Sequence, residues 1–400
     1  MNYIDLFAGC GGLSEGFDSA GDFKGLAHVE WESPMVKTLR NRLIKNNGYS
    51  KDEAQKRVVH FDIQKVQQLV HGCTKDSDLY PDNHKQFKEF GLRGIVGDEK
   101  IDLVIGGPPC QAYSIAGRAQ DKNSMKDDYR NYLFESFAAI VNQFQPKIFV
   151  FENVQGILSA TPGDIPVLQR IYDAFAQIGY LIRTPHDQKK SLLNANDFGV
   201  PQNRKRVIII GVRNDSNLSL DSIYEAIEKQ KVELKPNLKD AIGDLPKIQP
   251  LEVPTKNLSH GHVDDQKVEN HVPRFHNKRD VEIFKEWITR DMNGWPLEDK
   301  LDFYYRQTGK ISKHNKYRSL KWDKPSPTIV SHLQKDGLLF IHPDLEQARS
   351  LTVREAALIQ AFPNNFEFIG SQGHQYKMIG NAVPPLFAKK IALALKEFLK

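Results

Sequence analysis

The first 212 residues alternate short apolar runs with amphipathic stretches. The runs are Tyr3–Phe7, Gly25–Glu30, Ile101–Ile105, Ile148–Phe151 and Val207–Val212. Runs of this length and composition predict strands, and the stretches between them have helical spacing. Strands that alternate with helices predict an α/β fold with a doubly wound, mostly parallel sheet, which binds ligands at the carboxyl ends of its strands.

Beyond residue 212 this alternation stops. Prolines and scattered polar residues replace it over 213–349, which predicts a smaller, irregular second domain. Helical spacing returns in Val353–Phe362 and Leu386–Leu399, so we expect 350–400 to rejoin 1–212 in the first domain. The stretch Gln64–Lys100 is polar with little periodicity and is interpreted as an insertion between two strands.

Composition narrows the class of protein. The chain has 400 residues, enough for two or three domains, and 55 basic against 50 acidic residues give a formal charge of +5. This small excess permits a polyanionic partner without requiring one. No apolar run approaches the ~18 residues of a membrane helix, and the first residues lack a signal-peptide pattern. Three dispersed cysteines favour neither a disulfide framework nor a zinc site, so we expect a cytoplasmic protein without a membrane partner.

A glycine-rich turn follows the first apolar run. Gly9, Gly11 and Gly12 allow the backbone to turn tightly and approach a ligand. Glu30 and Asp62 end the next apolar runs and are suited to accept hydrogen bonds from ribose hydroxyls. The dinucleotide fingerprint GxGxxG is absent because Ser14 replaces its last glycine, so the loop by itself leaves open a nucleotide site, NAD binding or a turn without ligand.

Two further segments carry candidate chemistry. Cys110 follows the stiff turn Gly-Gly-Pro-Pro, which favours a thiolate nucleophile over a buried structural thiol. Glu152 directly follows an apolar run and is a candidate acid, the alternative being a solvated carboxylate. Gln202, Arg204 and Arg206 would share one face of a strand, where the two guanidiniums suit a base carbonyl or a phosphate; a solvated edge strand is the alternative.

Read in order, these segments resemble the DNA (cytosine-5) methyltransferase family. The matching segments are Asp-Leu-Phe-Ala-Gly-Cys-Gly-Gly, Glu30-Trp31, Asp62-Ile63, Gly-Pro-Pro-Cys-Gln, Glu152-Asn-Val, Gln-Asn-Arg-Lys-Arg, Arg354-Glu-Ala-Ala and Gln375 to Pro384. Each is weak alone, but all of them in family order are specific. The resemblance covers 1–212 and about 350–400, and it implies a Rossmann-like methyltransferase domain with 213–349 as the target-recognition domain.

The resemblance also implies roles for residues. Cys110 would add to C6 of a flipped-out cytosine, Glu152 would hold N3 and the exocyclic amine, and Arg204 and Arg206 would hold the base carbonyl and the loop, with Asn153 in support. The cofactor would be S-adenosyl-L-methionine, leaving as S-adenosyl-L-homocysteine, and no metal is implied. Its expected contacts are Phe7, Cys10, Gly11, Glu30, Trp31, Asp62, Ile63, Pro109, Leu133 and Asn381. Ala116 departs from family members that carry serine there.

The variable segment has its own basic stretch. Phe303–Lys335 holds eight basic residues against one acid, interleaved with aromatic residues, which predicts contact with DNA phosphates; a solvated basic face is the alternative. Four histidines lie between His260 and His276, and we interpret them as hydrogen-bonding or loop residues rather than metal ligands.

The resulting prediction is a monomeric bacterial enzyme that methylates a specific double-stranded DNA sequence and protects it from a cognate restriction endonuclease. A tRNA-modifying enzyme of the same chemistry is the close alternative, and the long variable segment argues against it. An NAD oxidoreductase would need the missing fingerprint, and a nucleic-acid-binding protein without activity would not need Cys110, Glu152 and Arg204 together.

Overall fold

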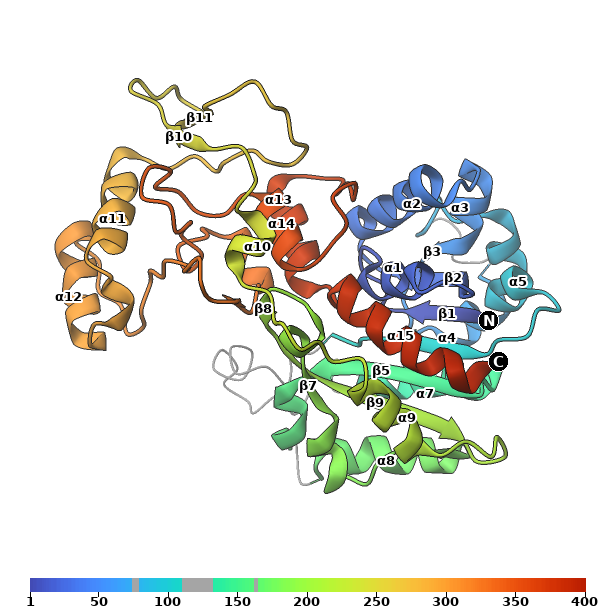
Figure 1. Ribbon diagram of the computed structural model, residues 1–400. Helices are drawn as coiled ribbons and strands as arrows, with labels where there is room; N and C mark the ends of the chain where they lie inside the picture. The colour runs from blue at the N-terminus through green and yellow to red at the C-terminus, as the bar shows by residue number, and fades with distance from the viewer. Residues whose placement is uncertain (74–78, 110–131, 162–164) are drawn as a thin grey trace. The chain divides into compact units, whose positions relative to one another are not determined.

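The computed structural model describes residues 1–73, 79–109, 132–161 and 165–400. They divide into two compact units (Figure 1), each described separately below. Unit 1 comprises Met1–Gly199, Arg204–Leu234 and Ala382–Lys400, and unit 2 comprises Val200–Asn203 and Lys235–Asn381.

Unit 1 is built on a mostly parallel sheet, as predicted. In its described part the strand order is β3-β2-β1-β4-β5-β9-β6, with β7 also paired to β9. The strands are β1 (Asn2–Leu6), β2 (Lys24–Glu30), β3 (Val58–His60), β4 (Leu103–Gly106), β5 (Ile148–Val154), β6 (Tyr180–Leu181), β7 (Leu192–Asn194) and β9 (Lys205–Arg213). The strands from β3 to β5 are parallel, and β9 runs antiparallel to β5, β6 and β7.

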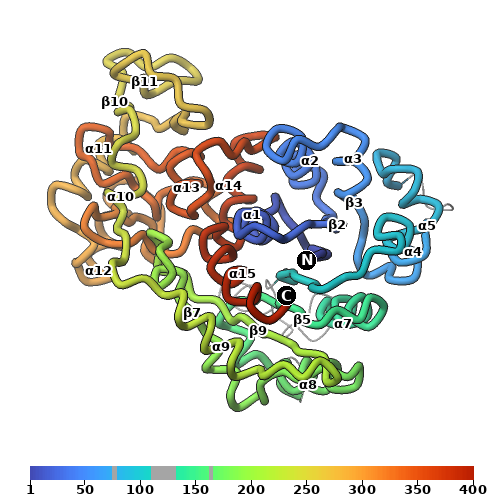
Figure 2. The backbone as a smooth tube through the Cα atoms, turned by 45° about the vertical axis from the view of Figure 1, so that its right-hand side comes forward, coloured from blue at the N-terminus to red at the C-terminus, as the bar shows by residue number. Residues whose placement is uncertain are grey.

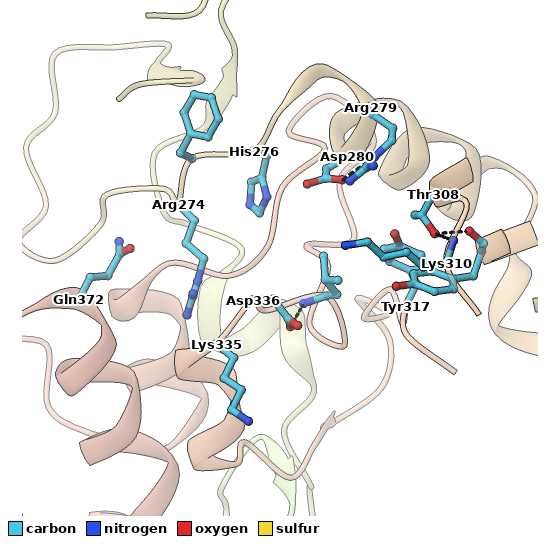
Figure 3. A pocket seen from close by; sticks show the side chains of 13 residues that line it. Arg274, His276, Arg279, Asp280, Thr308, Lys310, Tyr317, Lys335, Asp336 and Gln372 are labelled. Atoms are coloured by element: carbon cyan, nitrogen blue, oxygen red, sulfur yellow. Dashed lines mark hydrogen bonds and ion pairs between the residues drawn. The ribbon is translucent and has the colours of Figure 1, made fainter. Parts of the chain in front are cut away.

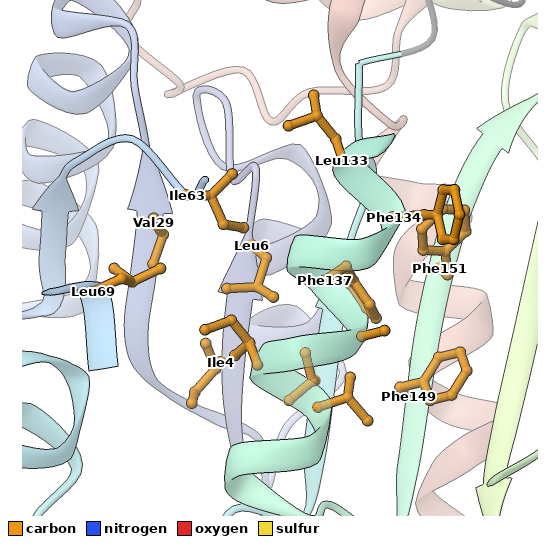
Figure 4. Packing of buried hydrophobic residues seen from close by; sticks show 14 of the residues in the cluster. Ile4, Leu6, Val29, Ile63, Leu69, Leu133, Phe134, Phe137, Phe149 and Phe151 are labelled. Carbon is orange, nitrogen blue, oxygen red and sulfur yellow. The ribbon is translucent and has the colours of Figure 1, made fainter. Parts of the chain in front are cut away.

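Helices cover both faces of this sheet because its strands bury side chains on both sides. They are α1 (Gly12–Ser19), α2 (Ser33–Asn47), α3 (Lys51–Arg57), α4 (Val66–His71), α5 (Lys85–Val96), α7 (Leu133–Phe144), α8 (Val167–Gln177), α9 (Leu220–Glu228) and α15 (Pro385–Leu399). On one face, Phe137 of α7 packs edge-on against Phe149 and Phe151 of β5, with centroids 5.8 and 5.2 Å away (Figure 4). On the other, α1 lies so close to α15 that a Cβ at Gly16 would come within 2.4 Å of the Ala388 Cβ.

The stretch 64–100 lies between β3 and β4, as the predicted insertion between two strands, and contains regular helices. It contains α4 and α5, and Leu69, Phe87 and Leu92 are buried in the same apolar cluster as Ile4 and Leu6. The helical periodicity is weak because α5 is interrupted at Gly91, which has a positive φ of 61°. The segment therefore adds a layer to the sheet as well as a loop.

Unit 2 has little sheet and a core of its own. Its helices are α10 (Leu238–Ile242), α11 (Lys278–Thr289), α12 (Leu297–Thr308), α13 (Val353–Ile359) and α14 (Gln372–Asn381). Its strands form two short ladders, β10 (Ile248–Pro250) with β11 (His260–His262) and β8 (Gln202–Asn203) with β12 (Ser326–Pro327). Trp287 of α11 packs against Phe303 of α12 and against Tyr317. Long irregular segments join these elements, as predicted (Figure 2). The two regular helices α11 and α12 were not predicted from the sequence.

The described residues also form several short 3₁₀ turns. They are η3 (Gln155–Ser159), η4 (Asp187–Ser191), η5 (Ala195–Phe198), η6 (Met292–Gly294) and η7 (Ser331–Gln334). Among the described residues, one stretch, Gln372–Leu399, is long and apolar enough to cross a membrane by composition. It is mostly buried, as the core helix of a globular protein is, and it is interrupted between α14 and α15.

The boundaries of the units differ from the predicted 1–212 plus 350–400 and 213–349. The first unit keeps the chain to Leu234, because Tyr224 of α9 hydrogen-bonds the backbone of Ile208 and Ile210 in β9. The chain returns at Ala382 rather than at 350, because buried hydrogen bonds tie α13 to unit 2: Arg354 donates to the Glu269 carbonyl at 2.9 Å. Side-chain contacts of this kind leave no periodicity in the sequence.

Candidate active site

The carboxyl ends of four parallel strands lie at one edge of the sheet in unit 1. Leu6 at the end of β1 is in register with Val29 of β2 and with Gly106 of β4, and Gly106 is in register with Phe151 of β5. The predicted polar groups follow these positions in the chain, so the sheet brings the glycine loop, Glu30 and Glu152 to a common edge.

The glycine loop is held by a buried carboxylate. Glu30 accepts hydrogen bonds from the backbone N–H of Gly9 at 2.7 Å, of Trp31 at 2.8 Å and of Glu32 at 2.7 Å. Burial raises the pKa of Glu30, and these amides oppose that shift. Phe7 and Gly9 have positive φ angles of 57° and 58°, and the Glu30 hydrogen bond to Gly9 holds the loop in this conformation. Glu30 therefore shapes the loop directly.

Groups suited to a nucleoside surround this loop. The Trp31 side chain is 54% exposed although it is large and apolar. A Cβ at Gly9 would meet only the Met35 sulfur within 4 Å among the described atoms, so the loop is open there. Asp62 is partly exposed after β3, with Oδ1 accepting from the Gln64 N–H at 3.0 Å. An exposed ring, carboxylates and an open glycine turn fit a nucleoside-type cofactor.

The remaining predicted cofactor contacts are more dispersed. Cys10 is buried, and burial raises the pKa of its thiol, so its backbone rather than its sulfur is suited to a contact. Ile63 and Leu133 are also buried, whereas Pro109 is exposed. Asn381 is the last residue of α14 and belongs to unit 2.

Glu152 forms an ion pair beside the turn that leads to the predicted nucleophile. Its Oε1 lies 2.7 Å from Nε of Arg206 on the neighbouring antiparallel strand β9. A Cβ at Gly107 would come within 2.7 Å of Glu152 Oε2, so the turn approaches this carboxylate closely and a side chain there would displace it. Asn153 donates to the Pro108 carbonyl at 3.4 Å and holds the same turn. Cys110, and with it Ala116, lies outside the described residues.

The three polar residues predicted on one strand face do not share a strand. Gln202 belongs to β8 in unit 2, where it accepts from the Ile329 N–H at 2.9 Å and donates to Gln360 at 2.6 Å. Arg204 lies between strands, is 1% exposed and donates to the Ala382 carbonyl at 2.9 Å. Arg206 alone reaches Glu152. The prediction of one face is wrong because the backbone leaves the sheet at Arg204, which local alternation cannot reveal.

A family model described as C-5 cytosine-specific DNA methylase matches residues 1–74 and 75–397. The chain belongs to this family. It is a DNA (cytosine-5) methyltransferase, as the ordered motifs predicted.

Curated relatives resemble this methyltransferase over its whole length. It is 35% identical to type II methyltransferase M.Bpa9945I of Bacillus paralicheniformis, over 100% of this chain and 99% of the relative. It is 33% identical to type II methyltransferase M1.HphI of Haemophilus parahaemolyticus, over 99% and 86%. These relatives place the chain among methyltransferases of type II restriction–modification systems.

Solved structures share the fold. A prophage-encoded E. coli protein, described as a DNA modification methyltransferase, is 24% identical with a TM-score of 0.64 over 100% of this chain and 99% of that chain. The S. pombe Dnmt2 methyltransferase is 15% identical with a TM-score of 0.56 over 99% of both. At these identities the likeness supports the Rossmann-like fold alone.

Unit 2 of the methyltransferase contains a basic cleft of about 460 Å³ (Figure 3). Arg274 and Arg279 line it but have partners in the protein: Arg274 donates to the Gln334 carbonyl at 3.1 Å, and Arg279 pairs with Asp280 at 3.1 Å. Lys310 and Lys335 line it without an ion pair among the described residues. Part of the predicted basic stretch thus borders a cleft.

The histidines of unit 2 form hydrogen bonds, as interpreted from the sequence. His271 contacts Thr352 Oγ1 at 3.0 Å and the Pro246 carbonyl at 2.9 Å, and His276 contacts Ser350 Oγ at 3.1 Å. Burial lowers the pKa of His276 to about 3 and that of His260 to about 4. These rings are neutral parts of the unit 2 core.

Proposed function

We propose that this methyltransferase transfers a methyl group from S-adenosyl-L-methionine to C5 of a cytosine in a specific double-stranded DNA sequence. The reaction proceeds through a covalent adduct between Cys110 and C6 of a flipped-out base. The observation that carries the proposal is the Glu152–Arg206 pair, held against the Gly107–Pro108 turn that leads to Cys110.

The chain's own residues activate the base. Cytosine C5 is a poor nucleophile while the ring is aromatic, and addition of the Cys110 thiolate at C6 makes C5 enamine-like. Glu152 holds N3 and the exocyclic amine and stabilises the adduct as N3 gains a proton. Arg206 orients Glu152, and Arg204 holds the backbone at Ala382, so both arginines have positioning roles. Once C5 carries the methyl group, water accepts the C5 proton, N3 gives up the proton it gained, and the Cys110–C6 bond breaks to return the thiolate. Because a stacked base cannot reach these groups, the cytosine leaves the helix.

The cofactor site lies at the same sheet edge. S-adenosyl-L-methionine, when bound, supplies an electrophilic methyl group and leaves as S-adenosyl-L-homocysteine. The residues of unit 1 that would hold it are Phe7, Cys10, Gly11, Glu30, Trp31, Asp62, Ile63, Pro109 and Leu133, and the family resemblance adds Asn381. The exposed Trp31 ring, the open Gly9 turn and the Glu30 carboxylate support this assignment.

Unit 2 serves as the target-recognition domain. Its lysines beside the cleft supply phosphate contacts, and neighbouring polar side chains contact base edges. The enzyme acts as a monomer in the bacterial cytoplasm, where it methylates the sites of a cognate endonuclease that works independently.

Methylation of DNA by the purified protein tests the function directly. The protein is incubated with S-adenosyl-L-methionine and unmethylated genomic DNA, and 5-methylcytosine is located by conversion sequencing. One recurring sequence with one methylated cytosine is expected. If the DNA stays unmethylated and tRNA is methylated in a parallel reaction, the substrate is RNA and this proposal is wrong.

The Cys110→Ala variant tests the covalent step. Because the thiolate is the proposed nucleophile, we expect no methylation above background while S-adenosyl-L-homocysteine still binds. Cys73→Ala, which removes a buried thiol that has no proposed role in the reaction, is the matched control, and we expect it to keep activity. Turnover by Cys110→Ala close to wild type would contradict the adduct.

A further inference from the structure

The outer strand of the unit 1 sheet is covered by a loop from the 64–100 segment. β3 is at the end of the strand order, so the backbone groups on its free side need partners from elsewhere. Asn83 supplies them at His60: its Oδ1 accepts from the His60 N–H at 2.8 Å and its Nδ2 donates to the His60 carbonyl at 2.7 Å. Arg40 donates to the Val58 carbonyl at 2.8 Å. These two side chains replace a neighbouring strand.

The His60 ring makes a second connection, which the sheet edge does not need. Its Nδ1 lies 3.1 Å from Asp82 Oδ1, and its Nε2 lies 2.8 Å from the Trp31 carbonyl oxygen. Asp82 is itself held by Arg40, whose Nη1 donates to Oδ2 at 2.7 Å. Both ring nitrogens lie within hydrogen-bond distance of an oxygen acceptor, and the tautomer decides which of them carries the N–H. The chain of contacts runs from Arg40 through Asp82 and His60 to Trp31.

Trp31 depends on this chain because little else holds it. Its side chain is 54% exposed, so packing alone does not fix the indole ring. Its N–H is bound by Glu30 at 2.8 Å and its carbonyl by His60 at 2.8 Å, so both backbone groups of the residue are fixed. A fixed backbone limits the staggered rotamers that the exposed indole can adopt.

We propose that His60 and Asp82 are positioning residues for the cofactor: the Leu79–His84 loop, acting through the His60 ring, holds the backbone of Trp31 so that its indole is preorganised to contact the cofactor. The proposal rests on the proposed function, since it takes Trp31 as a cofactor contact. It gives the 64–100 segment a part in cofactor binding that is separate from its packing against the sheet. Preorganisation of a contact raises affinity because less ordering remains to occur on binding.

Steady-state kinetics separate positioning from folding. In His60→Ala and Asp82→Ala we expect KM for S-adenosyl-L-methionine and Kd for S-adenosyl-L-homocysteine to rise about tenfold, the order of one charge-assisted hydrogen bond. KM for DNA and kcat should stay within about twofold of wild type, because neither Glu152 nor the Cys110 turn is touched. His60→Gln keeps an N–H donor at the Nε2 position, so it should recover part of the affinity.

The Asp52→Ala variant is the matched control. Asp52 lies 3.4 Å from Nε2 of His84, so it forms an aspartate–histidine pair with the same loop, but that pair does not contact Trp31. Its KM for the cofactor should equal that of wild type. Thermal unfolding of each variant shows whether the sheet edge is intact, and Asp82→Asn, which keeps the side-chain shape, replaces any alanine variant that does not fold.

Three results would overturn the proposal in different ways. If the wild type binds S-adenosyl-L-homocysteine and the folded His60 and Asp82 variants bind it equally well, positioning by the loop is wrong while the proposed function stands. If the wild type itself does not bind it, the cofactor assignment fails and this proposal fails with it. A lower kcat and melting temperature together with a rise in both KM values would assign His60 and Asp82 a merely structural role.

Discussion

Each unit contains a poorly exposed ion pair between arginine and glutamate, and the two pairs are satisfied differently. In unit 1, Glu152 contacts Arg206 through Oε1, while Oε2 faces the side-chain-free Gly107 at the strand ends. In unit 2, Glu355 takes two hydrogen bonds from Arg349, at 2.7 and 2.6 Å, and another from the Thr352 N–H at 2.7 Å. A carboxylate whose acceptors are filled by the protein stabilises the fold, whereas one that faces a glycine turn can still bind a substrate.

The surroundings of the pairs differ in the same way. Unit 1 gains its stability from apolar layers on the sheet, so a polar group at the strand ends is free for chemistry. Unit 2 has little sheet, and its interior includes Arg349, Glu355 and several histidines. Buried polar groups must be matched in full, so unit 2 depends on hydrogen bonds that a change of charge disrupts.

The largest expected effect is on activity, from Glu152→Gln. Loss of the carboxylate removes the group that holds N3 of the base, so we expect kcat to fall by at least about 100-fold. The melting temperature should change little. Glu15→Gln is the control. Glu15 is similarly buried and pairs with Arg42 at 2.7 Å, but this pair does not lie at the strand ends. Methylation assays on both variants check this, and an equal loss in Glu15→Gln would remove the distinction.

The next effect is on stability, from Glu355→Ala. This variant leaves the Arg349 guanidinium buried without its carboxylate, and we expect a loss of about 3–5 kcal/mol in the free energy of unfolding. Glu286→Ala breaks an exposed pair with Arg290 on α11 and should cost about 0.3–0.5 kcal/mol. Urea unfolding followed by tryptophan fluorescence measures both. Equal losses of unfolding free energy in the two variants would show that the buried pair contributes no more to stability than the exposed pair.

A further effect on stability is expected from pH, and in unit 2. Burial lowers the pKa of His276 to about 3 and those of His260 and His342 to about 4, from an ordinary value near 6.5. Between pH 6.5 and 4 the unfolded chain binds protons that the folded chain does not, so stability is complete above this range and falls as the pH is lowered through it. Urea unfolding at pH 7.5 and pH 5 tests this; equal stability at both would contradict it.

The smallest effect concerns the basic stretch. Lys313 and Lys316 are exposed, whereas Lys321 pairs with Asp291 at 3.0 Å. Log affinity falls with log salt concentration, and replacing a lysine that contacts a phosphate by alanine should make this slope less steep by about 0.9. We expect Lys313→Ala and Lys316→Ala to do so and Lys321→Ala to change it less. DNA binding at several salt concentrations measures the slopes, and unchanged slopes would exclude this stretch as the phosphate contact.

The amino-acid sequence by itself predicted the strands β1, β2, β4, β5 and β9, the helices α13 and α15 and the order of the motifs. These features are local: a buried strand requires a run of apolar residues, and a helix requires its own spacing. The carboxyl ends of parallel strands share an edge, so the meeting of the glycine loop, Glu30 and Glu152 was also predictable. The same reasoning failed at Arg204, where the backbone leaves the sheet without any signal in the residues.

Only the tertiary structure decided the contacts between distant segments. The boundary at Ala382, the pairing of Arg206 with Glu152 and the path from Asp82 through His60 to Trp31 each join residues on different elements. Such contacts depend on the direction of single side chains after the chain has folded, and hydrophobic periodicity carries no record of that direction. The sequence therefore predicts which groups reach the active edge, and the fold decides which of them are held in place.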